Sequence, residues 1–138
     1  MTPEEGKALI RRYYDELWNA WRFDVAAQLL DPEIHFRGSL GRMVEGLEGF
    51  LGYMKHVQAA FPDFHNSIEE CVAEPDCVAA RLLFTGTHRG EIFGVAPTGR
   101  RVRYSGAGLF HLRGGRIADA WVLGDLAGLL LQLRPVEP

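Results

Sequence analysis

Apolar residues near the N-terminus recur three and four positions apart, which is the pattern of a helix with one buried face. The stripe comprises Leu9, Ile10, Tyr13, Tyr14, Leu17, Trp18 and Trp21. Ahead of it, Thr2-Pro3-Glu4-Glu5 places a capping threonine before a proline and a glutamate, which predicts a capping box at the helix start. A shorter helix is expected over 24–30, ending before Pro32, because the residue before a proline avoids helical dihedrals.

The rest of the chain predicts one more long helix and a set of strands. A short strand is expected over 33–38, and residues 45–62 then return to helical spacing until Pro62, although three glycines weaken that helix. Alternating segments between Pro-rich or Gly-rich turns predict strands at about 64–73, 77–88, 101–112 and 116–125. Residues 126–133 form either a closing helix or a tail. Helices followed by antiparallel strands predict an α+β fold, with the helices covering one face of a curved sheet.

Two registers are open for the last pair of strands. A two-residue turn at Gly114-Gly115 sets Arg113 opposite Arg116, whereas a three-residue turn sets Leu112 opposite Arg116. The second is favoured because it gathers small and apolar residues on one face. That inward face comprises Val102, Tyr104, Gly106, Gly108, Phe110, Ala118, Ala120, Val122 and Gly124.

The other face of these strands is predicted to be the outside of the sheet. It carries Arg103, Ser105, Leu109, His111, Ile117, Asp119, Trp121, Leu123 and Asp125. His111 and Asp119 share this face, so a structural or subunit contact is favoured over an acid/base pair. The large apolar residues standing together there predict contact with another subunit.

Length and charge narrow the class of protein. The chain has 138 residues and a formal net charge of −3 with dispersed basic residues, which favours one domain over 1–138 and no nucleic-acid partner. No apolar run is long enough to span a bilayer, so no membrane partner is expected. The N-terminus lacks the layout of a signal peptide, so a cytoplasmic location is expected. A three-residue turn over 74–76 would set Cys77 opposite Ala73 and Cys71 opposite Ala79, which favours two free cysteines.

Few polar side chains are candidates for chemistry. His88 either looks into a pocket mouth or bonds the turn that follows it, and both alternatives stay open. His35 either lines the pocket or is a satisfied edge histidine, and the second is favoured. Tyr104 is the hydroxyl on the small inward face, where it either donates to a bound carbonyl or ties to a neighbouring group. The histidines lack metal-ligand spacing and no glycine-rich phosphate loop follows a strand, so neither a metal nor a cofactor is expected.

Several motifs resemble one family over nearly the whole chain. These are GTHRGEIFGVAPTGRRV at 86–102, GGRI at 114–117, W-x-x-x-D at 121–125 and LLLQL at 129–133. They resemble the SnoaL-like polyketide cyclases, also described as ester cyclases, of the nuclear transport factor 2-like superfamily. The resemblance implies a cone-shaped, cystatin-like domain whose bent sheet wraps around the helices and encloses a pocket. It also implies dimers or tetramers formed through the outer face of the sheet, and a homodimer is expected here.

The resemblance also implies a reaction that this chain is not equipped to copy. Family members that close polyketide rings use a histidine and an aspartate on the last two strands as acid/base groups. Alignment through GRI at 115–117 and QL at 132–133 puts Gly108 and Val122 at those positions. Any proton transfer would then pass through His88, His35 or Tyr104.

Three hypotheses follow for the function. The first is an enzyme acting on a hydrophobic carbonyl compound. The second is a non-catalytic binder of a hydrophobic or aromatic molecule, and the third is an interaction module packed with its own side chains. The first two predict an interior cavity larger than roughly 300 Å³. Its expected lining is Tyr14, Trp18, Gly106, Gly108, Phe110 and Val122.

Overall fold

The N-terminal stripe starts as the sequence predicts and then changes helix type. In the computed structural model, which describes residues 1–134, α1 (Pro3–Arg12) begins with the predicted capping box, in which Thr2 and Glu5 each bond the other's backbone N–H. The chain then forms the π-helix η1 (Tyr13–Trp18) instead of one regular helix reaching Trp21. A π-turn within a longer helix is frequent at functional sites. Here it carries the aromatic half of the stripe.

The segment after η1 differs from the prediction. The 3-10 turn η2 (Phe23–Val25) and the single helical turn α2 (Ala26–Leu29) replace the helix expected over 24–30, and β1 (Leu30–Arg37) starts earlier than predicted. Pro32 lies inside β1 where the register with its parallel neighbour shifts, a place where a proline costs no ladder hydrogen bond. A strand that the sequence did not predict, β2 (Met43–Glu45), pairs with β1.

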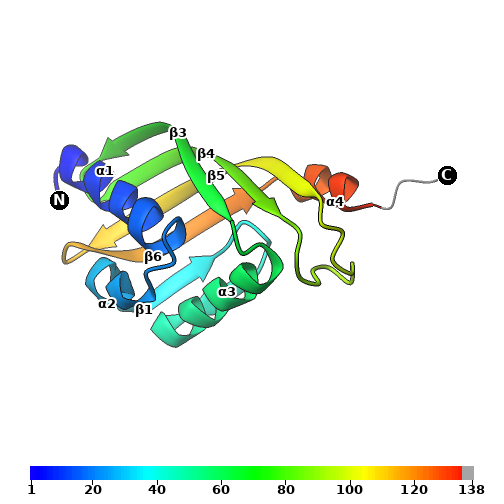
Figure 1. Ribbon diagram of the computed structural model, residues 1–138. Coiled ribbons are helices and arrows are strands. Elements are labelled where there is room, and N and C mark those ends of the chain that lie inside the picture. The colour runs from blue at the N-terminus through cyan, green and yellow to red at the C-terminus, as the bar shows by residue number, and fades with distance from the viewer. Residues whose placement is uncertain (135–138) are drawn as a thin grey trace.

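The α+β architecture is confirmed. The remaining elements are α3 (Gly46–Ala60), β3 (His65–Glu74), β4 (Cys77–Thr87), β5 (Arg101–Arg113), β6 (Arg116–Gly124) and α4 (Leu126–Leu133). The strands form one sheet in the order β2-β1-β6-β5-β4-β3, antiparallel except where β1 meets β6. Figure 1 shows α1 and α3 on the same side of the curved sheet, with α4 at the far end. Residues 135–138, which the single-domain prediction includes, lie outside the described part.

The β5–β6 hairpin corrects the predicted register but keeps the predicted faces. Gly114 and Gly115 make a two-residue turn with Arg113 opposite Arg116, so the favoured three-residue turn is wrong. The register then shifts, and His111 pairs with Asp119 rather than with Ile117. Ala118 is the extra residue at this shift, since it has no partner on β5. It restores the predicted alternation of inward and outward side chains further along both strands. Ile117 is the exception, because it lies before the shift and is fully buried.

The β3–β4 hairpin also differs by one position from the prediction. Glu74 pairs with Cys77, and Cys71 pairs with Ala80, because the turn has two residues instead of three. Asp76 takes a left-handed conformation in that turn, with φ of 59°. Both cysteines are free, which confirms the prediction.

The core between the helices and the sheet is built mainly from aromatic rings. Phe36 meets Phe50 edge to face with 4.9 Å between ring centroids, and Phe84 stacks on Tyr104 at 4.8 Å. Such pairs stabilise a core beyond the area that they bury. The hydroxyls of buried tyrosines are thereby brought into a mostly apolar interior, where each needs a partner.

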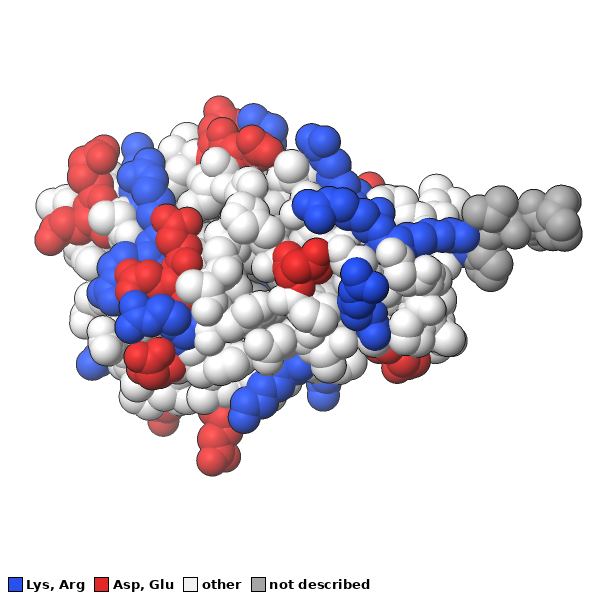
Figure 2. Space-filling model, in the orientation of Figure 1, with Lys and Arg blue, Asp and Glu red and all other residues white. Residues whose placement is uncertain are grey.

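The charged surface is mixed in sign. Figure 2 shows Lys and Arg alternating with Asp and Glu around α1, in agreement with the ion pairs that Glu16 makes with Arg12 and Arg22. Exposed pairs of this kind contribute little to stability. Within residues 1–134, no helix combines the length and the apolar character needed to cross a membrane.

Asp63 joins the end of α3 to the end of β4 and gives a pH-dependent prediction. Its carboxylate accepts the Thr87 N–H at 2.6 Å and the Thr87 hydroxyl at 2.7 Å. Burial opposes ionisation, but these hydrogen bonds outweigh it, so the pKa of the Asp63 carboxyl lies below its ordinary value. A lowered pKa stabilises the fold above the unfolded-state value of about 3.9, and this stabilisation is lost as pH falls through the folded-state value.

We therefore expect Asp63→Asn to lower the free energy of unfolding by about 1 kcal/mol at pH 7, since the carboxylate is partly exposed. Urea unfolding at pH 7 and near pH 2.5 measures the difference, which should shrink at the lower pH. Glu69→Gln changes an exposed carboxylate on β3 and serves as the control. An equal loss at both pH values would show that the effect is not electrostatic.

Candidate functional site

Buried hydroxyls gather where η1, α3 and the sheet meet. The Ser39 hydroxyl, on the loop between β1 and β2, lies 3.0 Å from the Tyr104 hydroxyl on β5. The Tyr53 hydroxyl, on α3, accepts the Leu40 N–H at 3.3 Å. We call Ser39, Tyr53 and Tyr104 the hydroxyl cluster. The space beside it is lined by Tyr13, Tyr14, Trp18, Phe36, Ser39, Tyr53, Phe64, Asn66, Phe84 and Val122.

The buried tyrosines are hydrogen-bond donors rather than bases. Burial raises the pKa of Tyr104 far above its ordinary value, and the bond to Ser39 only partly opposes that rise. Burial raises the pKa of Tyr53 to about 12, with Leu40 and Ser39 opposing it. Burial also raises the pKa of Tyr14 well above its ordinary value. All three phenols therefore keep their protons at neutral pH. Tyr14 and Tyr53 line the interior space, whereas the Tyr104 hydroxyl is not part of the lining and lies against Ser39, which is.

The described residues do not enclose the ligand-sized cavity that the sequence predicts. The space beside the hydroxyl cluster measures about 10 Å³, which is room for about one water molecule. A Cβ on Gly108 would lie 2.8 Å from Phe110, and one on Gly106 would lie 2.5 Å from Phe84. These rings fill the room that the two glycines leave. Of the predicted lining, Tyr14, Trp18 and Val122 face the remaining space.

His88 is fully buried but does not line this space. Its Nδ1 accepts the Thr98 N–H at 3.1 Å and lies 3.0 Å from the Thr98 hydroxyl. Its own backbone bonds Gly99 and Arg100. These contacts match the alternative in which His88 holds the loop that follows β4. Its Nε2 has no hydrogen-bond partner among the described residues.

His35 lies on the outer face of the sheet, away from the hydroxyl cluster. Its Nδ1 is 3.3 Å from the Glu45 carboxylate, and its side chain is 65% exposed. In register it neighbours Asp119, which in turn neighbours His111. The structure therefore does not bring His35, His88 and Tyr104 together. No group of three or more His, Cys, Asp or Glu residues in 1–134 is arranged to hold a metal ion.

Gly108 and Val122 are direct neighbours across β5 and β6. The favoured sequence register placed Gly108 opposite Ala120, so the observed register corrects it by two positions. Both residues belong to the inward face. A histidine and an aspartate at these positions would stand side by side.

Sequence reasoning missed several residues of the site. Tyr53 lies in the apolar stripe of α3, between Phe50 and Met54, so helical spacing could have identified it. Ser39 lies in a short Gly-Ser-Leu-Gly turn, where nothing in the sequence signals burial. Asn66 is buried on β3, where its backbone N–H donates to the Asn19 side chain at 2.8 Å. This long-range pairing also carries no local signal.

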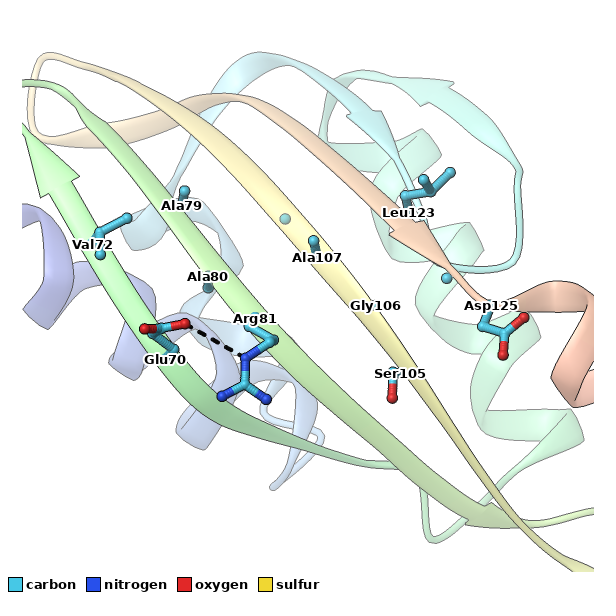
Figure 3. A pocket seen from close by; sticks show the side chains of 12 residues that line it. Glu70, Val72, Ala79, Ala80, Arg81, Ser105, Gly106, Ala107, Leu123 and Asp125 are labelled. Atoms are coloured by element: carbon cyan, nitrogen blue, oxygen red, sulfur yellow. Dashed lines mark ion pairs between the residues drawn. The ribbon is translucent and has the colours of Figure 1, made fainter.

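A broad groove of about 690 Å³ crosses the outer face of the sheet. Figure 3 shows its floor of small side chains, including Ala79 and Ala107, and the 3.6 Å ion pair between Glu70 and Arg81 at one side. Large apolar side chains stand exposed on this face of β3, β5 and β6. They are Val72, Leu109, Trp121 and Leu123. We call these four residues the outer apolar patch.

A family model and a sequence relative match this chain over most of its length. The model for SnoaL-like polyketide cyclases matches residues 8–133. The aklanonic acid methyl ester cyclase AcmA of Streptomyces galilaeus is 33% identical over 131 residues, covering 94% of this chain and 90% of the relative.

Solved structures share the fold. AclR of Streptomyces galilaeus, a candidate hydroxylase, superposes with a TM-score of 0.82 at 29% identity, over 99% of this chain and 91% of its own. A candidate SnoaL-like polyketide cyclase from Jannaschia sp. CCS1 has a TM-score of 0.88 at 23% identity, over 98% and 95% of the two chains. At that identity the likeness concerns the fold alone. The expected cone-shaped architecture is confirmed.

Proposed function

Because this chain belongs to the SnoaL-like polyketide cyclase family, we propose that it acts by acid/base chemistry on a hydrophobic, carbonyl-containing small molecule. The buried pair of Tyr104 and Ser39 is the observation that carries this proposal. It places a protonated phenol among aromatic rings on β5, one of the two strands on which the family resemblance implies an acid/base pair. Gly108 and Val122 replace that pair here.

Tyr104 supplies the hydrogen-bond donor, one of the two groups that acid/base chemistry beside a carbonyl requires; the other is a base. Its O–H donates to the carbonyl oxygen and stabilises the negative charge that develops there when a proton leaves the neighbouring carbon. The residues that line the space include neither a carboxylate nor a histidine to remove that proton. The proton must then pass to solvent water or hydroxide. A carbon between two carbonyl groups is acidic enough for that, so a 1,3-dicarbonyl compound with an aromatic or apolar body fits this site best.

The same missing base favours a second candidate function. A protein with a hydrogen-bond donor but no base can hold a carbonyl compound without converting it. The alternative is therefore a binder of a small hydrophobic ligand, using the same hydroxyl cluster.

An assay of the purified protein with an aromatic polyketide methyl ester separates the two functions. Ring closure is followed by absorbance, and complex formation by native mass spectrometry. Turnover that saturates with ester supports the enzyme. A stoichiometric complex without turnover supports the binder, and neither complex nor turnover contradicts both.

We also propose that the protein forms a homodimer through the outer face of its sheet. The outer apolar patch supports this, because Trp121 and Leu123 are each 46% exposed and Val72 is 58% exposed. Large apolar side chains gathered on one face are typical of an interaction surface. The groove between them would receive side chains of the second copy, and its small floor residues allow close approach.

A further inference from the structure

The loop 38–42, between β1 and β2, covers the hydroxyl cluster at the end of β6. It is a tight turn closed on itself, since the Gly38 N–H bonds the Arg42 carbonyl and the Gly41 N–H bonds the Gly38 carbonyl, each at 2.9 Å. Ser39 and Leu40 are nevertheless almost completely buried, at 6% and 7% exposure. A loop tip is usually the most exposed part of a hairpin. This one is turned inward.

The loop lies close against the elements around it. A Cβ on Gly124 would lie 2.5 Å from the Ser39 carbonyl oxygen, so β6 and the loop backbone touch directly. A Cβ on Gly38 would collide with the Tyr53 ring at 2.1 Å. Beyond this packing, two hydrogen bonds connect the loop to the two tyrosines of the hydroxyl cluster. They join Ser39 to Tyr104 and the Leu40 N–H to Tyr53.

We propose that the loop 38–42 opens to admit a ligand to the interior site. The Tyr53 and Tyr104 hydroxyls then replace their hydrogen bonds to the loop with hydrogen bonds to the ligand. In the closed form these hydroxyls bond Leu40 and Ser39. When the loop opens, both are released and turn to the two oxygens of a dicarbonyl ligand. The identity of the ligand rests on the proposed function, whereas the opening of the loop does not. The closed form also explains why so little space remains beside the cluster.

The other walls of the site are less able to move. Of the residues that line the space, Ser39 and Phe64 lie outside helices and strands. Phe64 is held by its stack on Phe84 at 5.9 Å and by the bonds between its neighbour Asp63 and Thr87. The loop, by contrast, is joined to Tyr53 and Tyr104 by two neutral hydrogen bonds, which stabilise only modestly because water replaces them on opening. Arg37 also donates to the Gly38 carbonyl at 3.3 Å, but this bond lies at the base of the loop, next to β1, and not at Ser39 or Leu40.

Amide hydrogen exchange of the whole protein, measured by mass spectrometry, tests the opening of the loop 38–42 without any ligand. Tyr53→Phe keeps the ring and removes the partner of the Leu40 N–H. We expect exchange of the loop amides to become about fivefold faster, which corresponds to the loss of one neutral hydrogen bond. Peptides from β5 and β6 should not change, and that pattern separates loop opening from a loss of global stability.

Tyr14→Phe is the matched control, because Tyr14 lines the same space but has no hydrogen bond to the loop. Its loop exchange should equal that of the wild type. Ser39→Ala is a second test, which breaks the bond to Tyr104 and should again accelerate exchange of the loop alone. Unchanged amide hydrogen exchange of the loop in both Tyr53→Phe and Ser39→Ala would overturn the proposed opening of the loop. Equal acceleration in Tyr14→Phe would overturn it as well. Failure to turn over or bind the polyketide ester, with faster loop exchange, would overturn only the proposed function.

Discussion

Replacing Tyr104 with phenylalanine is expected to lower turnover of an aromatic polyketide ester about a hundredfold, if the proposed reaction holds, and to change affinity for the ester less than about threefold. The lost hydroxyl donates to an oxygen on which charge develops during the reaction, so its contribution is larger in the transition state than in the bound substrate. Because burial raises the pKa of Tyr104 and keeps it protonated at neutral pH, the substitution removes a hydrogen-bond donor and not a charge. Steady-state kinetics that separate kcat from KM measure both quantities.

Two histidine variants serve as controls for this result. His88→Gln changes a side chain that hydrogen-bonds Thr98 rather than the hydroxyl cluster, and His35→Gln changes one on the outer face. Turnover per folded molecule should stay within about threefold of the wild type in both. The sequence alone left these histidines as alternatives to Tyr104. A large loss of turnover in either histidine variant, together with normal turnover in Tyr104→Phe, would indicate that this histidine and not Tyr104 takes part in proton transfer.

We expect Leu123→Glu to dissociate the proposed dimer into monomers, with the dissociation constant raised at least about a hundredfold. A carboxylate at this position would be desolvated against the apolar surface of the second copy, on both sides of a symmetric interface. Leu123 is nearly half exposed in the single chain, so the change should leave its folding stability almost unaltered. Sedimentation velocity over a range of concentrations measures the assembly state.

Leu131→Glu provides the comparison for the interface. Leu131 is 61% exposed on α4, outside the outer apolar patch, so this variant should assemble like the wild type. A wild-type protein that remains monomeric at every concentration would contradict the proposed dimer. Dissociation by Leu131→Glu alone would move the interface to α4.

The sequence predicted the long elements well because their signals are local. The capping box at Thr2, the helix ending before Pro62 and the four long strands all follow from spacing and turn residues within a few positions. The two hairpin registers were misjudged because pairing depends on turn length and on one extra residue after Ile117, which the alternation of side chains conceals. Strand β2 was missed because its three residues are too few to show the alternation of apolar and polar side chains by which a strand is recognised.

The site was predictable in its aromatic lining and not in its volume. Tyr14 and Trp18 follow from the helical stripe, and Tyr104 follows from the inward face of β5. Glycines at 106 and 108 suggested open space, but the ring of Phe84 on the neighbouring strand covers the first, and the ring of Phe110, two residues along β5, covers the second. Such filling depends on side-chain rotamers and long-range packing, which carry no signal along the chain. Burial of Ser39 likewise depends on how a loop folds back.

The direct pairing of Gly108 with Val122 determines what the inward face would need in order to carry an acid/base pair at these positions. A histidine and an aspartate there would be direct neighbours on the inward face. The histidine would nevertheless meet the ring of Phe110, since even a Cβ on Gly108 lies 2.8 Å from it. The Phe110 ring would therefore have to turn aside or be replaced by a smaller residue. The packing around Phe110, and not only the two absent side chains, thus keeps an acid/base pair from forming at this place.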